Sequence, residues 1–411
     1  MTSKQVNLKC IDKLRMPGPP IIIVAALFET EAIVNSCKEK NISISAICDT
    51  EKRKTFQSFK NFEVIHTPDL KQRYPQARFL FASQHIVDVE DQLLSYGYNE
   101  FYSALELLEN YEIKKHEHSV SDDYMEKRLT IYKKSHQAYF DESKIYMRSL
   151  DIMITTKCSL KCESCSNLMQ YYTDAKHSEK NNILNSIKAL HEHVEEISEY
   201  RLIGGEPMMN RDWANITYEI SEKHPDNEIF IYTNGTIPPQ ETQLEKFKGR
   251  KVNFVITEYG KLSRNLGKLQ EMLDKFNITY VSTPAENWLD CSDLKKHNRK
   301  PQENQEVFKQ CCVKYIYTLL DGKLYRCPFI ANAANLKALP DNKANYVDLL
   351  NDNTNLSKKI ERLIKSRYFF PGCDSCVGRP YDTSGKIGYN GKGMITPGIQ
   401  SKQPLKYKIY N

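Results

Sequence analysis

The sequence predicts an α/β protein with two successive strand–helix arrays and a small α+β domain toward its C-terminal end. Short apolar runs alternate with amphipathic stretches over residues 1–110 and again over 149–290. Such alternation is typical of parallel sheets whose strands are joined by helices. Residues 111–148 are polar with scattered apolar positions, so we expect a helical linker there. A hairpin pattern flanked by cysteines marks the small domain over 291–380, and a partly ordered tail is expected over 381–411.

The first array follows a polar lead-in that ends at Pro20. Its apolar runs and helical stretches predict a small parallel sheet with helices between the strands. In chain order these segments are Ile21–Leu27, Glu29–Lys40, Ile42–Cys48, Phe62–Thr67, Phe79–Ala82, Gln84–Tyr96 and Phe101–Ser103. The pattern resembles the Rossmann-like domains of proteins in sugar and glycan metabolism.

Asp49 ends the second expected strand, about twenty residues after the first strand–helix turn, where dinucleotide-binding domains carry a ribose-binding acid. No glycine occurs between Gly18 and Gly97, however, so the turn lacks the residue that lets backbone approach a pyrophosphate closely. Glu29 at the start of the helix would also repel that group. We therefore expect docking or substrate recognition in this domain in preference to dinucleotide binding.

The second array continues to about residue 285. Apolar residues spaced three and four apart over His177–Tyr200 predict one amphipathic helix. The pattern then predicts strands at 229–233, 252–257 and 278–283, and helices at 240–248 and 262–275. In a β/α array of this kind the chemistry lies at the C-terminal ends of the strands.

Three cysteines follow the apolar run Leu150–Ile154 in the spacing Cys-x3-Cys-x2-Cys, at Cys158, Cys162 and Cys165. A structural zinc ion or an ordinary four-iron cluster needs four protein ligands. Three cysteines with no histidine in the loop would leave one coordination position open to a small molecule. The alternatives are three buried apolar thiols, or a zinc site completed from elsewhere in the chain.

Further strand ends carry glycines and polar residues. The glycines allow backbone to come close to a ligand, and a carboxylate can accept a hydrogen bond from an ammonium group. At the last of these strand ends the polar residues are either ligand contacts or part of an ordinary strand-to-helix turn. The residues are Gly204, Gly205, Glu206 and Pro207 in the first segment, Thr233, Asn234 and Gly235 in the second, and Thr257 and Glu258 in the third.

These motifs, in this order, resemble the radical S-adenosylmethionine (SAM) superfamily, whose cysteine loop follows the first strand of a partial (β/α)6 barrel. The resemblance implies that the three cysteines hold a [4Fe–4S] cluster whose fourth iron chelates SAM, and that one electron cleaves SAM to a 5′-deoxyadenosyl radical. It implies that the Gly-Gly-Glu-Pro segment holds the SAM amino group, that Thr-Asn-Gly lies near the ribose, and that Thr257 and Glu258 contact SAM. The implied electron donor is a flavodoxin- or ferredoxin-type protein.

A second group of cysteines surrounds the expected hairpin Tyr315–Tyr325, whose Asp-Gly pair is a strong signal for a two-residue turn. The spacing to Gly322 favours Cys312 over the adjacent Cys311. On spacing alone, four cysteines of this kind would hold zinc. The group consists of Cys312, Cys327, Cys373 and Cys376.

After a radical SAM core, this group resembles the SPASM domain in its shortened twitch form, which binds one auxiliary [4Fe–4S] cluster. The full SPASM pattern has further cysteines after the close pair, and none occurs beyond Cys376. The resemblance therefore implies one auxiliary cluster with four protein ligands. Cys291 and Cys311 are left over, and each is either an ordinary thiol or a hydrogen-atom donor facing the substrate.

Composition limits the classes of protein to which this chain can belong. No apolar run reaches the roughly 18 residues of a membrane span, and the N-terminal residues lack a signal-peptide apolar region. Twelve cysteines then indicate metal binding or reactive thiols in a cytoplasmic protein, in preference to a disulfide framework. The 58 Lys and Arg residues are interspersed with 52 Asp and Glu, so the charge pattern does not indicate nucleic-acid binding and is compatible with an anionic substrate.

The resemblance extends over roughly residues 150–380, and twitch relatives include an aminocyclitol dehydrogenase and a cofactor-biosynthesis cyclase. Together with a sugar-type N-terminal domain, this favours oxidation of a sugar, cyclitol or nucleotide-linked sugar, in surface polysaccharide or natural-product biosynthesis. The first alternative is epimerisation of such a substrate, with Cys291 or Cys311 returning hydrogen, and the second is peptide modification. A metal-stabilised scaffold without catalysis is the non-enzymatic alternative.

Overall fold

The computed structural model describes residues 5–51, 58–113, 118–285, 288–352, 354–380, 394–395, 398–401 and 404–410. The chain divides into two compact units, Met1–Tyr146 and Met147–Asn411. This division lies close to the predicted boundary at residue 148. Within the described residues, no helix combines the length and the apolar character that a membrane span needs.

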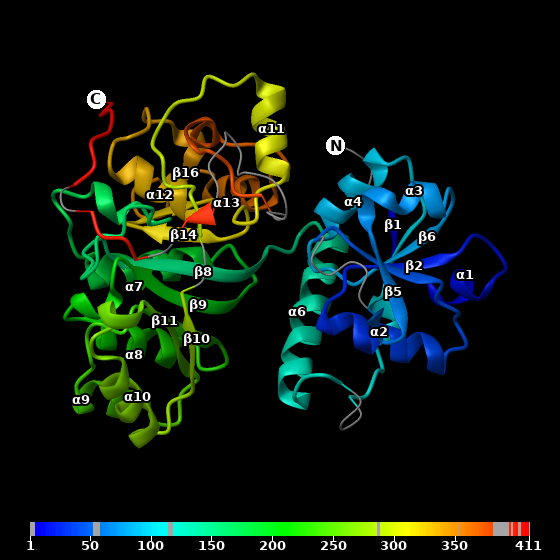
Figure 1. Ribbon diagram of the computed structural model, residues 1–411, viewed down its shortest axis with the longest axis horizontal. Coiled ribbons are helices and arrows are strands. Elements are labelled where there is room, and N and C mark those ends of the chain that lie inside the picture. Colours follow the sequence, from blue (N-terminus) through cyan, green and yellow to red (C-terminus); the bar gives the residue numbers. More distant parts are fainter. Residues whose placement is uncertain are drawn as a thin grey trace. The chain divides into compact units, whose positions relative to one another are not determined.

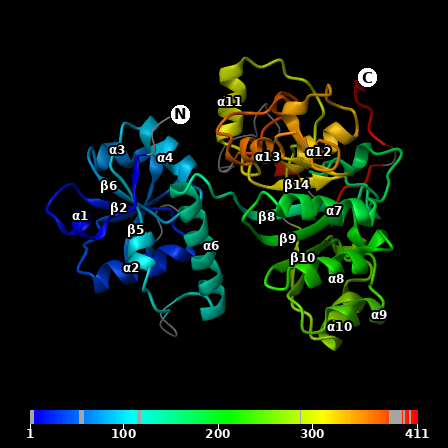
Figure 2. The same ribbon diagram turned by 180° about the vertical axis from the view of Figure 1, so that it is seen from behind.

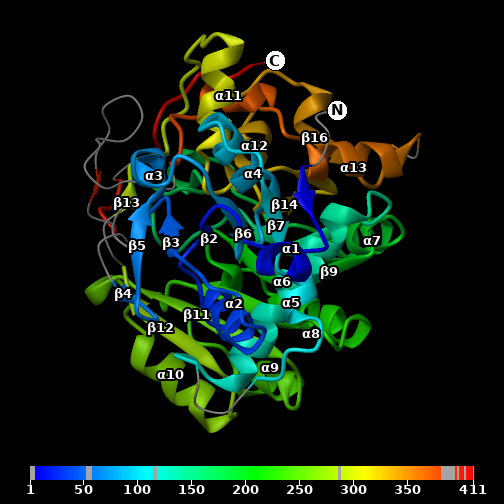
Figure 3. The ribbon, with the colours of Figure 1, turned by 90° about the vertical axis from the view of Figure 1, so that its right-hand side faces the viewer.

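The first unit contains a seven-stranded sheet in the order β1-β7-β6-β2-β3-β5-β4 (Figures 1 and 3). Its pairings are parallel except that β4 runs antiparallel to β5. Five of the parallel strands lie in the order β5-β3-β2-β6-β7. Numbered along the chain from β2, this is the order 3-2-1-4-5 of doubly wound sheets. The strands are β1 (Val6–Asn7), β2 (Ile21–Val24), β3 (Ala46–Asp49), β4 (Ser58–Phe59), β5 (Phe62–His66), β6 (Arg78–Phe81) and β7 (Phe101–Ser103).

Helices cover both faces of this sheet. Successive side chains of a strand point to opposite faces, so Ile21 and Ile23 join one apolar cluster while Ile22 and Val24 join the other. Helices α1, α2 and α5 contribute to the first cluster, and α3 and α4 to the second. The helices are α1 (Ile11–Arg15), α2 (Phe28–Glu39), α3 (Leu70–Arg73), α4 (Ile86–Ser95), α5 (Leu105–Leu108) and α6 (Asp122–Phe140).

Helix α6 is an integral part of the first unit, whereas the sequence predicted a linker over 111–148. Met125, Leu129 and Tyr132 are buried in the first apolar cluster. The Tyr132 hydroxyl also donates to the carbonyl of Phe81 at 2.8 Å. The scattered apolar positions of this stretch therefore form a buried face, which the sequence pattern was too irregular to indicate.

Asp49 stabilises the first strand–helix turn of its own domain. Its carboxylate accepts hydrogen bonds from the backbone N–H groups of Ala26 and Glu51, both at 2.8 Å. Ala25 in this turn has φ +85°, a left-handed conformation that a non-glycine residue rarely adopts. By its position in the sequence, Asp49 resembled a ribose-binding acid. In the structure it stabilises the backbone of a turn that contains no glycine.

The second unit is organised on an eight-stranded sheet in the order β12-β11-β10-β9-β8-β14-β15-β16. Strands β9 to β12 pair in parallel with their neighbours, and β14 pairs in parallel with β8. The strands are β8 (Tyr146–Thr155), β9 (Glu196–Gly204), β10 (Glu228–Thr233), β11 (Val252–Glu258), β12 (Tyr280–Pro284), β14 (Tyr317–Leu320), β15 (Lys323–Tyr325) and β16 (Tyr346–Asp348). A separate two-stranded sheet pairs β13 (Trp288–Leu289) with β17 (Met394–Ile395).

Helices α7, α8 and α10 cover one face of the second sheet, while α12 and α13 lie beside β14 and β16 (Figures 1 and 2). The predicted helix over His177–Tyr200 is too long: α7 ends at His191, and Ile197 belongs to β9. Pairing of β9 with β10 overrides the helical spacing of the apolar residues there. The helices are α7 (Lys180–His191), α8 (Trp213–Lys223), α9 (Glu241–Leu244), α10 (Leu266–Lys275), α11 (Pro301–Lys309), α12 (Pro328–Asn335) and α13 (Leu356–Lys365).

The predicted hairpin is confirmed. Strands β14 and β15 pair in antiparallel around Asp321 and Gly322, whose φ angles of +49° and +75° are those of a type I′ turn. Because β14 also pairs with β8, the hairpin extends the sheet of the second unit. The C-terminal cysteine region is therefore built directly onto the strand that leads into the first cysteine loop.

Candidate active site

The first cysteine loop begins where β8 ends at Thr155. Burial raises the pKa of all three thiols, and for Cys158 the neighbouring Cys165 and Cys162 raise it further. The three thiols are therefore close enough to interact electrostatically. Three buried thiols will ionise together only if a positively charged group joins them, as a metal cluster does.

The glycine pair after β9 is required by the close approach of the cysteine loop. A Cβ atom on Gly204 would lie 2.3 Å from the carbonyl oxygen of Thr155, and one on Gly205 would lie 2.2 Å from that of Lys157. Those same carbonyls accept hydrogen bonds from the backbone N–H groups of Gly205 (3.0 Å) and Glu206 (2.9 Å). The sequence predicted that these glycines let backbone approach a ligand. In the structure they let the backbone of the cysteine loop approach the end of β9.

Glu206 is fully buried and links two strand ends. Its carboxylate accepts hydrogen bonds from the Thr233 hydroxyl at 3.0 Å and from the backbone N–H groups of Asn234 (2.9 Å) and Met208 (3.3 Å). Burial raises the pKa of this carboxyl to about 7, although these hydrogen bonds lower it. The contact between this carboxylate and the SAM ammonium group stays a prediction; in the structure the carboxylate is buried and its donors come from the protein. Pro207 follows as the first residue of a short 3₁₀ turn.

The Thr-Asn-Gly strand end reaches the cysteine loop directly. The amide nitrogen of Asn234 donates to the Ser159 hydroxyl at 3.1 Å and lies 3.8 Å from the Cys158 sulfur. Gly235 has φ +69°, a conformation that favours glycine, as the chain turns away from β10. The cysteine loop, the Gly-Gly-Glu-Pro segment and Thr-Asn-Gly therefore meet at the C-terminal edge of the sheet.

The fourth strand end carries Thr257 and Glu258, followed by Tyr259 of the same predicted segment. Glu258 accepts a hydrogen bond from the Ser282 hydroxyl at 2.5 Å, and no hydrogen bond links Thr257 or Glu258 to the cysteine loop among the described residues. For Tyr259, in contrast, burial raises the pKa, and all three cysteines of the first loop raise it further. Tyr259, directly after β11, therefore lies close enough to the three cysteines to interact with them electrostatically.

Residues of the C-terminal tail pack on the first cysteine loop. The Gln400 amide nitrogen donates to the Cys162 sulfur at 3.3 Å, while its oxygen accepts from the backbone N–H of Lys161 at 2.5 Å. The N–H of Glu163 donates to the carbonyl of Ile399 at 2.8 Å. The tail was expected to be partly ordered at best, yet residues 398–401 form part of this site.

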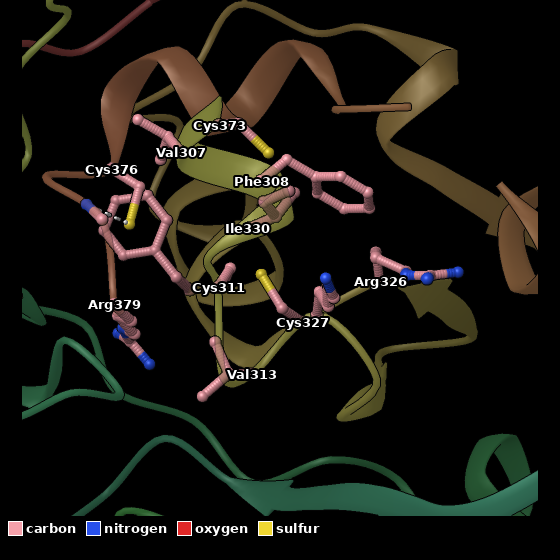
Figure 4. Close-up of a pocket in the computed structure, with 13 residues that line it drawn as sticks. Val307, Phe308, Cys311, Val313, Arg326, Cys327, Ile330, Cys373, Cys376 and Arg379 are labelled. Atoms are coloured by element: carbon pink, nitrogen blue, oxygen red, sulfur yellow. Dashed lines mark hydrogen bonds between the residues drawn. The ribbon is translucent and has the colours of Figure 1, made fainter. Parts of the chain in front are cut away.

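A second site is formed by four thiols that line one pocket (Figure 4). Burial raises the pKa of Cys311 to about 12 and that of Cys327 and Cys376 to about 11, and it raises the pKa of Cys373 as well. The thiols come from three segments: the end of α11, the start of α12 and the 3₁₀ helix Pro371–Ser375. Arg379 lines the same pocket.

Cys311 takes the place in this pocket that spacing assigned to Cys312. Cys312 is exposed and is not among the residues that line the pocket. The backbone explains the choice, since the N–H of Cys312 donates to the carbonyl of Arg379 at 2.8 Å and Cys311 forms a β-bridge with Pro380. Adjacent residues in extended pairing point to opposite sides, so only one of the two thiols can face inward.

Cys291 lies near this second site and is buried, with 6% of its surface exposed. It is close enough to Arg379 and Cys376 to affect the pKa of both. The role of hydrogen donor proposed for Cys291 or Cys311 gains no support from this arrangement, because both thiols lie at the second cysteine site.

The candidate metal ligands of this unit are the two groups of cysteines, one in a loop and one around a pocket. Among the residues that the structure describes, no three His, Cys, Asp or Glu side chains meet closely enough to hold a single ion. The four thiols of the second site instead surround a pocket with an arginine in its wall. Three thiols in one loop and four around a pocket fit the ligand sets of two iron–sulfur clusters, one with an open position and one without.

Residues 152–257 match the radical SAM superfamily, and they include the first cysteine loop and both strand-end motifs that meet it. These residues form a radical SAM superfamily domain, and enzymes of that superfamily use SAM and a [4Fe–4S] cluster. A GTP 3′,8-cyclase of Clostridium acetobutylicum is 27% identical over 289 residues, which are 64% of this chain and 84% of the cyclase.

Solved structures give weaker similarities. BtrN in complex with AdoMet and 2-DOIA aligns with a TM-score of 0.35 and 15% identity, over 57% of this chain and 94% of BtrN. Native anSMEcpe with bound AdoMet aligns with a TM-score of 0.35 and 12% identity, over 53% of this chain and 84% of that protein.

Proposed function

We propose that the protein oxidises a carbinol carbon of a sugar, cyclitol or nucleotide-linked sugar, with an auxiliary [4Fe–4S] cluster as the electron acceptor. The observation that carries this proposal is the pocket lined by Cys311, Cys327, Cys373 and Cys376. Four thiolates would fill every protein-accessible position of a cubane, which leaves the cluster no iron for substrate and suits it to electron transfer.

In total, the proposed reaction removes two hydrogens from the substrate: one hydrogen atom, one proton and one electron. Cys158, Cys162 and Cys165 would hold the cluster that cleaves SAM, and the bound cofactors would supply the radical that takes one hydrogen atom from the carbinol carbon. A base would accept the hydroxyl proton, and a cluster held by Cys311, Cys327, Cys373 and Cys376 would accept the remaining electron. A flavodoxin- or ferredoxin-type donor would supply the electron that starts each turnover.

The chain's own residues position these groups. Cys158, Cys162 and Cys165 would hold the first cluster, and Gly204 and Gly205 let the backbone of the cysteine loop approach the strand ends. Placing the reactive groups within a protein interior excludes water and holds the substrate in the reactive orientation. We propose that the first unit recognises the substrate or docks a partner, since its first turn has no glycine to admit a pyrophosphate.

The test uses anaerobically reconstituted protein with SAM, a reductant and a panel of sugars and cyclitols carrying deuterium at single carbons. We expect a product that lacks two hydrogens of the substrate, and transfer of one substrate deuterium into 5′-deoxyadenosine. A product of unchanged mass that gains deuterium in heavy water would establish epimerisation instead. Protein without iron that does not cleave SAM would establish the scaffold alternative.

A further inference from the structure

Arg379 is a buried arginine in the wall of the second cysteine pocket, with 5% of its surface exposed. Figure 4 shows its side chain beside the pocket, extending toward the green part of the chain that carries the first cysteine loop. A guanidinium remains charged in proteins, so this residue places a permanent positive charge in a region of low polarity. Such a burial is costly unless negative charge or hydrogen bonds compensate it.

The hydrogen bonds of Arg379 connect the two cysteine sites. Its carbonyl accepts from the N–H of Cys312, next to Cys311 in the second site. Its side chain donates from Nη2 to the carbonyl of Ser166 at 2.9 Å, and Ser166 follows Cys165 of the first site. Within the part of the chain that the structure describes, its Nε has no hydrogen-bond acceptor. The main chain of Arg379 is therefore held at one site while its side chain contacts the other.

The thiols around Arg379 show where its charge acts. Arg379 lines the same pocket as Cys311, Cys327 and Cys376, and its side chain also donates to the carbonyl of Ser166, the residue after Cys165 of the first loop. These thiols can therefore compensate the buried guanidinium when they carry negative charge. A [4Fe–4S] cluster with four thiolates has a net negative charge that increases on reduction, so a fixed positive charge nearby favours the reduced state.

A second arginine of the same pocket does not occupy this position. Arg326 is also buried, but its Nη1 donates to the carbonyls of Leu363 and Ile364 at 2.5 and 2.6 Å. In Figure 4 its guanidinium points away from the sulfur atoms of Cys327, Cys373 and Cys376. Arg299 donates to the carbonyl oxygens of Cys376 at 2.9 Å and Cys373 at 3.3 Å, and so contacts the backbone of the close pair.

We propose that Arg379 is a positioning residue that raises the reduction potential of the auxiliary cluster and connects its pocket to the first cysteine loop. This inference rests on the proposed function, because it requires an auxiliary cluster. A higher potential makes the cluster a better acceptor for the substrate electron, and the contact with Ser166 holds the acceptor pocket against the loop where the radical chemistry begins. The auxiliary cluster would accept the substrate electron, and the oxidised form of the flavodoxin- or ferredoxin-type protein would then take that electron from the cluster.

The experiment is a redox titration of the reconstituted protein followed by electron paramagnetic resonance, with Arg379→Gln and Arg379→Lys. Glutamine removes the charge and keeps much of the shape, so we expect the equilibrium for reducing the auxiliary cluster to fall by about tenfold, a shift of about 59 mV for one electron. Lysine keeps the charge, so in Arg379→Lys the equilibrium constant for reducing the auxiliary cluster should stay within about threefold of the native value. Arg299→Gln should shift the equilibrium less than Arg379→Gln, because Arg299 contacts only the backbone of the close pair.

The outcomes separate this inference from the proposed function. A native-like potential in Arg379→Gln with both clusters present would overturn the role of Arg379 and leave the auxiliary cluster intact. Absence of a second cluster signal in the native protein, with about half the expected iron, would overturn the proposed function itself. If Arg379→Gln loses its second cluster, Arg379→Lys is the deciding variant. A native-like potential in Arg379→Lys supports the proposal, and a tenfold lower equilibrium constant for reducing the auxiliary cluster overturns it.

Discussion

Glu206 accepts a hydrogen bond from the backbone N–H of Asn234 at 2.9 Å, and this contact joins the ends of β9 and β10 beneath the first cysteine loop. The same carboxylate accepts from Thr233, and the N–H of Glu206 donates to the carbonyl of Lys157 at 2.9 Å. One buried residue therefore connects the Gly-Gly-Glu-Pro segment, the Thr-Asn-Gly segment and the cysteine loop.

Glu206→Gln should weaken this junction. Glutamine offers one acceptor oxygen, and its NH2 group would face an N–H donor of Asn234 or Met208, which leaves a buried donor unsatisfied at a cost of about 1–3 kcal/mol. We expect lower unfolding free energy, less iron in the first cluster and weaker SAM binding together. Weaker SAM binding with native stability and native iron would instead indicate that the carboxylate contacts SAM itself.

Gly205→Ala should disrupt the cysteine loop. The added methyl group would lie 2.2 Å from the carbonyl oxygen of Lys157 and 2.7 Å from the Cβ of Cys158, so the loop must move. About half of the iron and all SAM cleavage should be lost, as measured by metal analysis and chromatography of 5′-deoxyadenosine. The matched control is Gly267→Ala in α10, where a Cβ meets nothing within 4 Å and both properties should stay native.

His136 should make the first unit sensitive to acid. It is fully buried between the Ser103 hydroxyl (2.7 Å) and the Ser83 carbonyl (3.0 Å), and burial lowers its pKa to about 3, although the Ser83 carbonyl raises it. Between this value and the unfolded value of about 6.5, the unfolded chain binds a proton that the folded chain does not. The stability is thus fully present above pH 6.5 and should fall by about 1.4 kcal/mol for each pH unit below it.

Calorimetry of the full chain between pH 5 and pH 7.5 tests this, with His136→Gln as the comparison. The variant should be less stable at pH 7.5 but lose less stability on acidification, because glutamine does not titrate. An equally steep pH dependence in both proteins would show that other groups cause it.

Local signals made much of the fold predictable. The Asp321-Gly322 turn depends on two adjacent residues that both accept positive φ, so the hairpin was readable from the sequence. Strands such as Phe101–Ser103 were also readable, because a short apolar run bounded by polar residues is a local signal. Helix α6 was missed as a core element, because its few buried residues lie among many polar ones.

The choice of side chains at the site depends on contacts between distant parts of the chain. Pairing with Arg379 and Pro380, which lie more than sixty residues away, decides whether Cys311 or Cys312 faces the pocket. Gln400 reaches Cys162 from 238 residues away. Spacing along the sequence carries no information on either contact, whereas the cysteine loop itself is compact in sequence and could be recognised.

Gln400 should tune the first cluster. Its N–H donates to the Cys162 sulfur, and hydrogen bonds to cluster sulfurs help to set reduction potentials. Gln400→Leu should therefore lower the potential of the first cluster and slow SAM cleavage, most clearly with a weak electron donor. Lys406→Ala, an exposed position of the same tail, is the control and should titrate as the native protein does. An unchanged potential in Gln400→Leu would mean that the tail contact is structural.

Cys311→Ser and Cys312→Ser form a matched pair at adjacent positions that differ in the side they face. Cys311 lines the second pocket and Cys312 is exposed, so Cys311→Ser should lose about four of about eight irons while Cys312→Ser keeps them all. Both variants should retain SAM cleavage, because the first cysteine loop is intact in each. Metal analysis with Mössbauer spectroscopy measures the clusters, and the reverse pattern would return the ligand to Cys312. Stoichiometric zinc in the native protein, bound in place of the second four irons, would show that these cysteines form a zinc site and would remove the electron acceptor from the proposed reaction.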